Sequence, residues 1–183
     1  MKRLAFVGIA LVLSGCGYNR IQTLDEQVNG FKSQIEVQLQ RRADLVPNLV
    51  ETVKGFAAQE TGIFETLANA RAALGGAVRS GDLAEMATAN TALSGALGRL
   101  IAIAEDNPEI QSNENFRMLQ DQLEGTENRI SVARQDYNTA VRAYNGYIRR
   151  FPAVLTAKMT GAAAREYFEA EEGAREVPSV NFN

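Results

Sequence analysis

Cys16 is the only cysteine of this 183-residue chain, and it stands directly after an apolar run. Lys2 and Arg3 precede that run, which extends over 4–13, and small residues occupy the positions just before the cysteine. A basic start, a short apolar segment and small residues are typical of a secretory signal peptide. The run is far shorter than the roughly 20 residues that a membrane-spanning helix needs. We therefore expect residues 1–15 to be removed as a signal peptide.

The letters LSGC at 13–16 resemble the lipobox of bacterial lipoproteins, whose cysteine is lipidated and becomes the new N-terminus. Each buried methylene of an acyl chain such as palmitate contributes about 0.8 kcal/mol, and stable anchoring takes more than one chain. Gly17 follows the cysteine instead of an aspartate, which favours the outer membrane and periplasm in a Gram-negative host. The sequence thus predicts lipidation at Cys16 and an extracytoplasmic location. An ordinary cleaved signal or a short uncleaved anchor remains the alternative.

The composition excludes several kinds of catalytic and binding site. The chain has no histidine and no tryptophan, and its formal net charge is −3. Without histidine, Ser/His and Cys/His nucleophilic sites and the Glu-x-x-His pairs of di-iron bundles are excluded. An acidic chain without a basic block is a poor binder of nucleic acid. We therefore predict no catalytic residue, no metal site, no cofactor and no nucleic-acid partner. A carboxylate pair such as Glu60 with Glu127 stays open as a remote enzymatic alternative.

Charged residues interrupt the apolar stripes that a helical period traces along the chain. Arg42 falls between Leu39 and Val46, and Glu127 falls between Leu123 and Ile130. Buried charges must be paired or must extend outward along apolar stems. Our hypothesis is an interhelical polar network formed by Arg42, Asp44, Arg71, Glu127 and Arg134. The alternative places these residues at the rim, with their stems over the core.

Two further sets of polar residues lie on the same stripes. Asn90 stands among leucines, where it would fix helix register or mark an exposed edge of the bundle. Three tyrosines, Tyr137, Tyr144 and Tyr147, lie on the last long helical segment. We expect their rings in the core and their hydroxyls on polar partners, because tyrosine combines an apolar ring with a polar tip. The alternative for the tyrosines is a partner-binding surface.

Apolar residues recur at steps of three and four along almost the whole chain, which predicts helices throughout. One stripe runs over 28–56 and resumes over 63–74, and Pro47 either kinks this helix or starts a new one. The phase of the stripe favours a single kinked helix. Gly75-Gly76 and Ser80-Gly81 predict a loop, and Asp82 with Glu85 predicts a helix start of the capping-box kind. Asn107-Pro108 should end that helix.

A final long helix is expected from about Asn113 to Arg150, ending at Phe151-Pro152. Narrow stripes on long helices pack at shallow angles, as in coiled coils and antiparallel bundles. The predicted fold is all-α: an elongated antiparallel up-and-down helical bundle of three to four long helices, with a short C-terminal helix. We assign 1–15 to the signal peptide, 16–160 to the bundle, and 161–183 to the short helix and a flexible tail.

Several strings together resemble the LemA family over about residues 18–168. They are QRRADLVPNLV at 40–50, LEGTENRI at 123–130, ARQDYN at 133–138, YN at 144–145 and FP at 151–152. The resemblance implies a membrane-associated helical bundle that faces the extracytoplasmic side, with no established reaction. Some relatives are associated with magnetosome membrane formation. Two features depart from the family: many relatives begin with a transmembrane helix, and many carry a histidine where Gln59 stands here.

These features favour a protein that acts by contact and carries out no catalysis. We predict a lipid-anchored helical module at the cell envelope, bound to the membrane through Cys16 and contacting envelope proteins or further copies of itself. The alternative is a protein that self-assembles and remodels the membrane.

Overall fold

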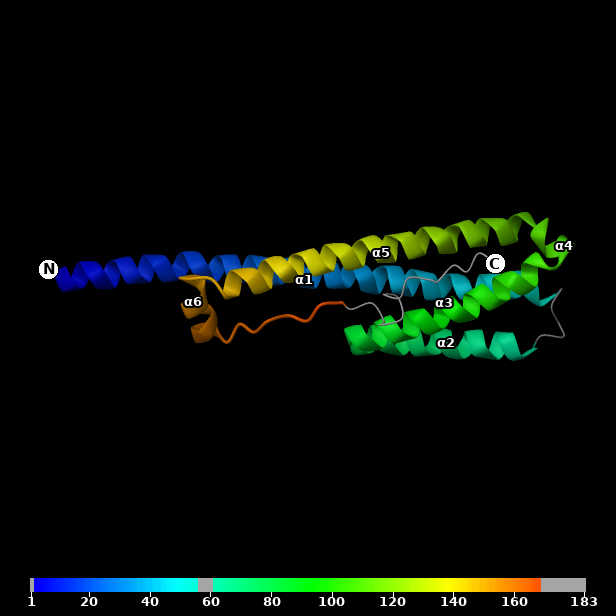
Figure 1. Ribbon diagram of the computed structural model, residues 1–183, viewed down its shortest axis with the longest axis horizontal. Helices are drawn as coiled ribbons and strands as arrows, with labels where there is room; N and C mark the ends of the chain where they lie inside the picture. Colours follow the sequence, from blue (N-terminus) through cyan, green and yellow to red (C-terminus); the bar gives the residue numbers. More distant parts are fainter. Residues whose placement is uncertain (1, 56–60, 169–183) are drawn as a thin grey trace, which may run out of the picture. The chain divides into compact units, whose positions relative to one another are not determined.

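The structure is a computed structural model that describes residues 2–55 and 61–168, with the backbone alone for 2–16 and 61. Within these residues the protein is helical and contains no strand, so the all-α prediction is confirmed. The elements are α1 (Lys2–Lys54), α2 (Thr61–Ser80), α3 (Leu83–Glu105), α4 (Pro108–Gln111), α5 (Glu114–Ile148) and α6 (Ala153–Thr160) (Figure 1). The expectations for Phe56, Gln59, Glu60 and the tail over 169–183 lie outside the described residues.

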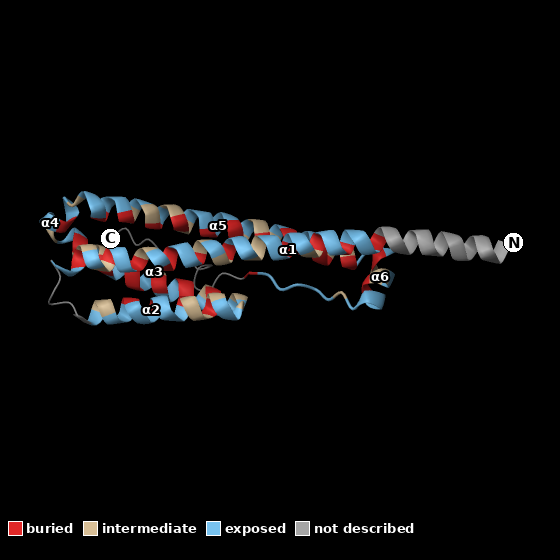
Figure 2. Cartoon of the chain, turned by 180° about the vertical axis from the view of Figure 1, so that it is seen from behind, coloured by how far each residue is buried: buried red, intermediate tan, exposed pale blue. Residues whose placement is uncertain are grey.

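The chain divides into two compact units. Unit 1 comprises Met1–Ile35 and Val132–Tyr167, and unit 2 comprises Glu36–Ser131 and Phe168–Asn183. The long helices α1 and α5 therefore contribute residues to both units. Along both helices buried residues recur among exposed ones (Figure 2). The buried positions follow the same steps of three and four that the apolar residues show in the sequence.

Helix α1 continues through Pro47, as the unbroken stripe indicates. A proline inside a helix removes one backbone hydrogen bond and costs about 3 kcal/mol. Val46 is 2% exposed and Leu49 is fully buried. Burying a side chain of this size contributes about 1.5–3 kcal/mol, so the two together outweigh the proline. One long helix is the result.

In unit 2, α2 and α3 lie side by side (Figure 1). The loop expected at Gly75-Gly76 is wrong, because both glycines lie inside α2. A helical glycine costs about 1 kcal/mol relative to alanine. Leu74 and Ala77, on either side of the pair, are buried at 0% and 4% exposure, and this burial keeps the segment helical. The part of the prediction that placed the turn at Ser80-Gly81 is confirmed at Gly81, whose positive φ of 72° suits glycine.

Helix α3 begins after Asp82, as predicted, because the Asp82 carboxylate accepts hydrogen bonds from the amides of Ala84 and Glu85. The Glu85 carboxylate accepts from the Ser80 hydroxyl at 2.8 Å. That hydroxyl in turn accepts from the Asp82 amide at 3.3 Å. In the expected capping box the Glu85 carboxylate would accept directly from the Asp82 amide. Here the Ser80 hydroxyl lies between these two groups and binds both.

The connection after α3 contains a short helix that the sequence analysis did not include. Asn107 caps α4 by accepting from the Glu109 amide, and Pro108 occupies its first position. Ile110 in α4 is 1% exposed, so this turn contributes to the core of unit 2. Asn113 then accepts from the amides of Asn115 and Phe116 and caps α5, close to the predicted start.

In unit 1, α5 ends at Ile148 and α6 follows Phe151-Pro152. A short C-terminal helix was expected from about Gly161, and most of that range lies outside the described residues. The structure has a helix before it, α6 at Ala153–Thr160, whose C-cap is Gly161 with a φ of +72°. Residues 162–167 are not helical. Phe151, where the final long helix was expected to end, is 81% exposed and lies beyond the last residue of α5.

Candidate functional site

A polar cluster lies in the interior of unit 2. We call it the Arg42 cluster, and it comprises Arg42 of α1, Asn90 of α3 and Glu127 of α5. Arg42 Nη1 donates to Asn90 Oδ1 at 2.7 Å and forms an ion pair with the Glu127 carboxylate. The side chain of Arg42 is 7% exposed, whereas that of Glu127 is 45% exposed. The cation is therefore enclosed, and its anion reaches it from a partly solvated position.

Two further members of the hypothesised network, Asp44 and Arg71, contact other partners. Asp44 is exposed and accepts from Gln40 Nε2 at 2.8 Å, one turn earlier on α1. Arg71 is exposed and donates Nε to the Ala43 carbonyl at 2.9 Å, which joins α2 to α1 without a carboxylate. Arg134 is half-buried and belongs to unit 1. The structure thus brings together Arg42 and Glu127 and adds Asn90, whereas Asp44 and Arg71 have the other partners given above.

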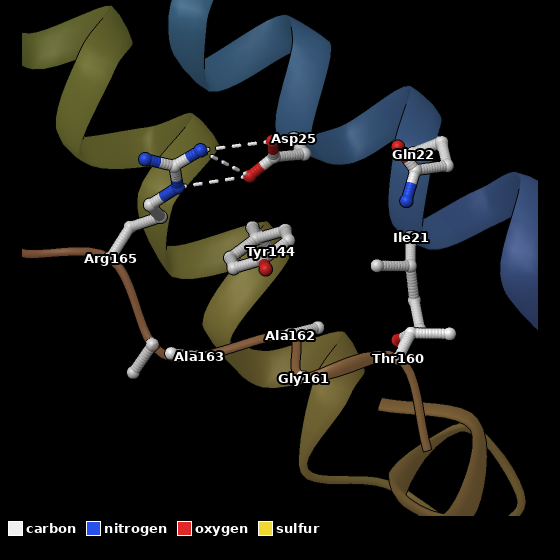
Figure 3. A pocket seen from close by; sticks show the side chains of 10 residues that line it. Ile21, Gln22, Asp25, Tyr144, Thr160, Gly161, Ala162, Ala163 and Arg165 are labelled. Carbon is white, nitrogen blue, oxygen red and sulfur yellow. Dashed lines mark hydrogen bonds and ion pairs between the residues drawn. The ribbon is translucent and has the colours of Figure 1, made fainter. Parts of the chain in front are cut away.

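A second polar site lies in unit 1, around the extended residues 162–167, which we call the strap. Asn145 of α5 binds the Arg165 backbone twice: it donates to the carbonyl and accepts from the amide, each at 2.8 Å. Tyr137 donates its hydroxyl to the Glu166 carbonyl at 2.9 Å. The Arg165 guanidinium forms a bidentate contact with Asp25 of α1, with both N–O distances 2.9 Å (Figure 3). Three side chains from two helices therefore hold the strap.

A cavity of about 360 Å³ lies beside the strap in unit 1. Its lining includes Ile21 and Asp25 from α1, Tyr144 from α5 and the strap from Ala162 to Arg165 (Figure 3). The Asp25–Arg165 pair lies at its edge, so the two charges nearest to the cavity already neutralise each other.

Burial perturbs the two tyrosines of this site. It raises the pKa of the Tyr137 hydroxyl above its ordinary value, an effect that Arg165 opposes and Glu166 reinforces. It also raises the pKa of Tyr144, an effect that Asp25 reinforces and Arg165 opposes. Tyr137 is thus a buried ring with a hydrogen-bonded tip.

These pKa shifts predict a loss of stability in alkali. The fold favours the neutral phenols, so their contribution is fully present below about pH 10 and is lost as the pH rises through the raised values. We expect the midpoint of thermal unfolding to fall between pH 10 and pH 12 and Tyr137→Phe to flatten this fall. Circular dichroism melts across this range measure it. The matched control is Tyr18→Phe at an exposed position, and an equal flattening by both variants would contradict the prediction.

Two comparisons with known proteins bear on the identity of the chain. The model of the LemA family matches residues 32–182. The chain belongs to the LemA family. The resemblance carried by the sequence strings is therefore confirmed. Within this LemA protein, the whole Arg42 cluster and the strap fall inside the matched range, whereas Asp25 precedes it.

The similar curated proteins are magnetosome proteins. Magnetosome proteins MamQ 1 and MamQ 2 of Paramagnetospirillum magneticum strain AMB-1 are each 32% identical over 89% of this chain and 68% of their own length. Magnetosome protein MamQ of Magnetospirillum gryphiswaldense has the same identity and coverage. The similarity thus extends over most of both chains.

The described part of this LemA protein holds no group of three or more His, Cys, Asp or Glu side chains placed to bind a metal ion. Within 2–55 and 61–168, no helix combines the length and hydropathy that crossing a membrane requires. The backbone of Cys16 lies within α1, and its side chain is outside what the structure describes. Lipidation at Cys16 therefore remains a prediction from sequence.

Sequence reasoning missed the strap. Asp25 and Arg165 are 140 residues apart, so no local spacing connects them. The one available signal was Asn145, a buried amide on an apolar stripe that needs partners for both its donor and its acceptor.

Proposed function

We propose that this protein is a lipid-anchored, extracytoplasmic helical module that acts through contacts at the cell envelope and not through catalysis. The anchor is proposed on the lipobox-like string that ends at Cys16. Membership of the LemA family supports membrane association. Three relatives are named as magnetosome proteins, and the similarity to them is consistent with a role at an organised cellular structure. Packing of long helices in an antiparallel up-and-down bundle is part of the same proposal.

The observation that carries the non-catalytic part is how the two ion-paired arginines are used. Arg42 binds Asn90 and Glu127, and Arg165 binds Asp25, so both cations contact side chains of their own chain. A catalytic site directs polar groups toward a ligand. Here the polar groups join helices to each other and to the strap.

The surface of unit 2 offers apolar contacts to a partner. Val37 is 61% exposed and Met118 is 50% exposed. Scattered exposed apolar residues are ordinary on a monomer, so their use in binding has to be tested directly. An envelope protein or a second copy of the chain is the expected partner.

The anchor is tested by mass spectrometry of the mature protein and by fractionation of cells. We expect a start at Cys16 with acyl chains attached, and release from the membrane fraction in the Cys16→Ser variant. The matched control is Ser14→Ala, which keeps a small residue before the cysteine and should leave the protein anchored. A mature chain that begins at Met1 without modification would overturn the anchor.

The contact role is tested by photo-crosslinking in intact cells. A photoreactive residue replaces Met118, and a second variant carries it at the neighbouring exposed Arg117. We expect site-dependent adducts with one envelope protein or with a second copy of the chain, identified by mass spectrometry. Adducts with a second copy alone, together with altered membrane shape on overexpression, would favour the self-assembling, membrane-remodelling alternative. A third variant carries the photoreactive residue at Val37. A contact role for this surface would be contradicted if Met118 gave no more adduct than Arg117 and Val37 gave none.

A further inference from the structure

The corner formed by the end of α5 and by α6 in unit 1 has an unusual distribution of apolar residues. Helix α6 buries its small residues, Ala153 and Ala157, each at 4% exposure. Leu155 and Met159 are 55% and 85% exposed. Residues four apart share one face of a helix, so the large apolar side chains form the outer face of α6 and the small ones the inner face. Phe151, 81% exposed, precedes this face.

The same corner is basic in an otherwise acidic protein. Between Asp136 and Glu166 the sequence contains no acidic residue. Within that stretch Arg149, Arg150 and Lys158 are exposed. The whole chain has a formal net charge of −3, whereas this stretch has a net positive charge. Exposed large apolar residues flanked by basic ones are typical of segments that lie in the interface of an anionic membrane.

The corner also lies next to the predicted point of anchoring. Gly17 of α1 is buried, and a Cβ atom built there would lie 3.2 Å from the Thr156 hydroxyl oxygen. Helix α6 therefore contacts α1 one residue after Cys16. Figure 1 shows α6 beside the first part of α1. Tyr18, the next residue, is 45% exposed, and tyrosine is enriched at membrane interfaces.

We propose that this corner, comprising Phe151, Leu155 and Met159 with Arg149, Arg150 and Lys158, docks onto the surface of an anionic bilayer. The apolar side chains enter the interface, and the basic side chains contact lipid phosphates. The location of the surface rests on the proposed anchor at Cys16. The surface itself adds a second point of attachment, which fixes the orientation of unit 1 on the membrane.

The experiment measures lipid contact at one labelled residue of the full chain. An environment-sensitive fluorophore is attached through Met159→Cys, and the anchored protein is reconstituted in vesicles of phosphatidylethanolamine and phosphatidylglycerol. We expect emission at shorter wavelength and quenching by spin-labelled lipids. The control is the same label at Met118→Cys in unit 2, which should show neither change. An unquenched label at position 159 in bilayer-anchored protein would overturn the proposal.

Charge dependence is tested with paired variants of the labelled protein. Arg149→Gln with Arg150→Gln should reduce quenching at position 159, and so should vesicles of phosphatidylcholine alone. Arg117→Gln with Arg129→Gln, which removes the same charge from exposed sites in unit 2, should leave it unchanged. Equal quenching in all variants and lipids would contradict the headgroup contact. Quenching lost equally in both double variants would contradict a specific surface.

Failure of the anchor is recognised separately. A lipidated Cys16 takes up no label, so two fluorophores per chain would reveal a free thiol and would count against the proposed function alone. The Cys16→Ser, Met159→Cys variant then gives the same quenching measurement without acyl chains. Quenching there supports the docking surface, and its absence on vesicle-bound protein overturns it.

Discussion

Glu127→Gln should destabilise the protein by about 2 kcal/mol, because it removes the carboxylate that pairs with the enclosed Arg42 guanidinium, while water screens part of the effect at the 45% exposed Glu127 side chain. The side chain of Arg42 is 7% exposed, and its other contact in the Arg42 cluster is the neutral amide of Asn90. Removing one partner of a buried ion pair costs more than removing both, since the remaining charge stays desolvated. In a chain of this size the thermal midpoint should fall by roughly 4–8 °C.

Circular dichroism melts at 222 nm measure this effect. Glu124→Gln, an exposed carboxylate one turn earlier on α5, is the matched control and should change the midpoint by less than about 2 °C. The triple variant Arg42→Met, Asn90→Leu, Glu127→Leu should recover most of the loss, because it replaces the ion pair and the buried amide that Arg42 binds by apolar groups. A Glu127→Gln midpoint equal to that of the control would contradict enclosure of the charge.

The Arg42 cluster also aligns helices, a role that its net contribution to the free energy of unfolding does not measure. It joins α1, α3 and α5 at one level of unit 2. A slip of any helix by one turn would separate the guanidinium from Asn90 or from Glu127 and leave a buried charge behind. Such a group fixes register more than it raises stability, as a single polar residue does in a coiled coil. We interpret the cluster as the device that aligns these three helices.

The helices could be predicted because each rests on a local pattern. The stripe through Arg42, Val46 and Leu49 was sufficient to carry α1 through Pro47, and Asp82 marked the start of α3. The loop predicted at Gly75-Gly76 was wrong because the preference of glycine for loops is a local property. The burial of Leu74 and Ala77 depends instead on packing between helices, such as that of α2 against α3. Helix α4 was missed because four residues are too few to show a period.

The polar contacts were harder to predict, since they depend on which faces meet. Spacing placed Arg42 and Glu127 on apolar stripes, and enclosed charge requires a partner. Spacing alone did not show that Asp44 points away from the cluster or that Arg71 binds a backbone carbonyl. The strap has no period at all. Its position depends on Asn145 and Tyr137, whose partners lie 20 and 29 residues further along the chain.

Asn145→Ala should release the strap while the helices of unit 1 remain folded. The variant removes both hydrogen bonds to the Arg165 backbone, each worth about 1 kcal/mol, and the two are made by a buried side chain. The Arg165 amide itself donates to Asn145, so its exchange with solvent reports the loss directly. We expect its hydrogen exchange to accelerate by about 30-fold, the factor that 2 kcal/mol represents.

Two variants show which contact holds the strap. Asp25→Asn weakens an ion pair whose partners are 26% and 42% exposed, and such pairs contribute only about 0–1 kcal/mol. Exchange at Arg165 should therefore rise by less than about fivefold in that variant. Asn128→Ala, an exposed amide on the same helix, should leave it unchanged. If Asp25→Asn accelerated exchange more than Asn145→Ala, the surface ion pair would hold the strap and the buried amide would not. The expected order, with Asn145 dominant, follows from burial, because water competes for the partly exposed ion pair, whereas the Asn145 side chain is buried.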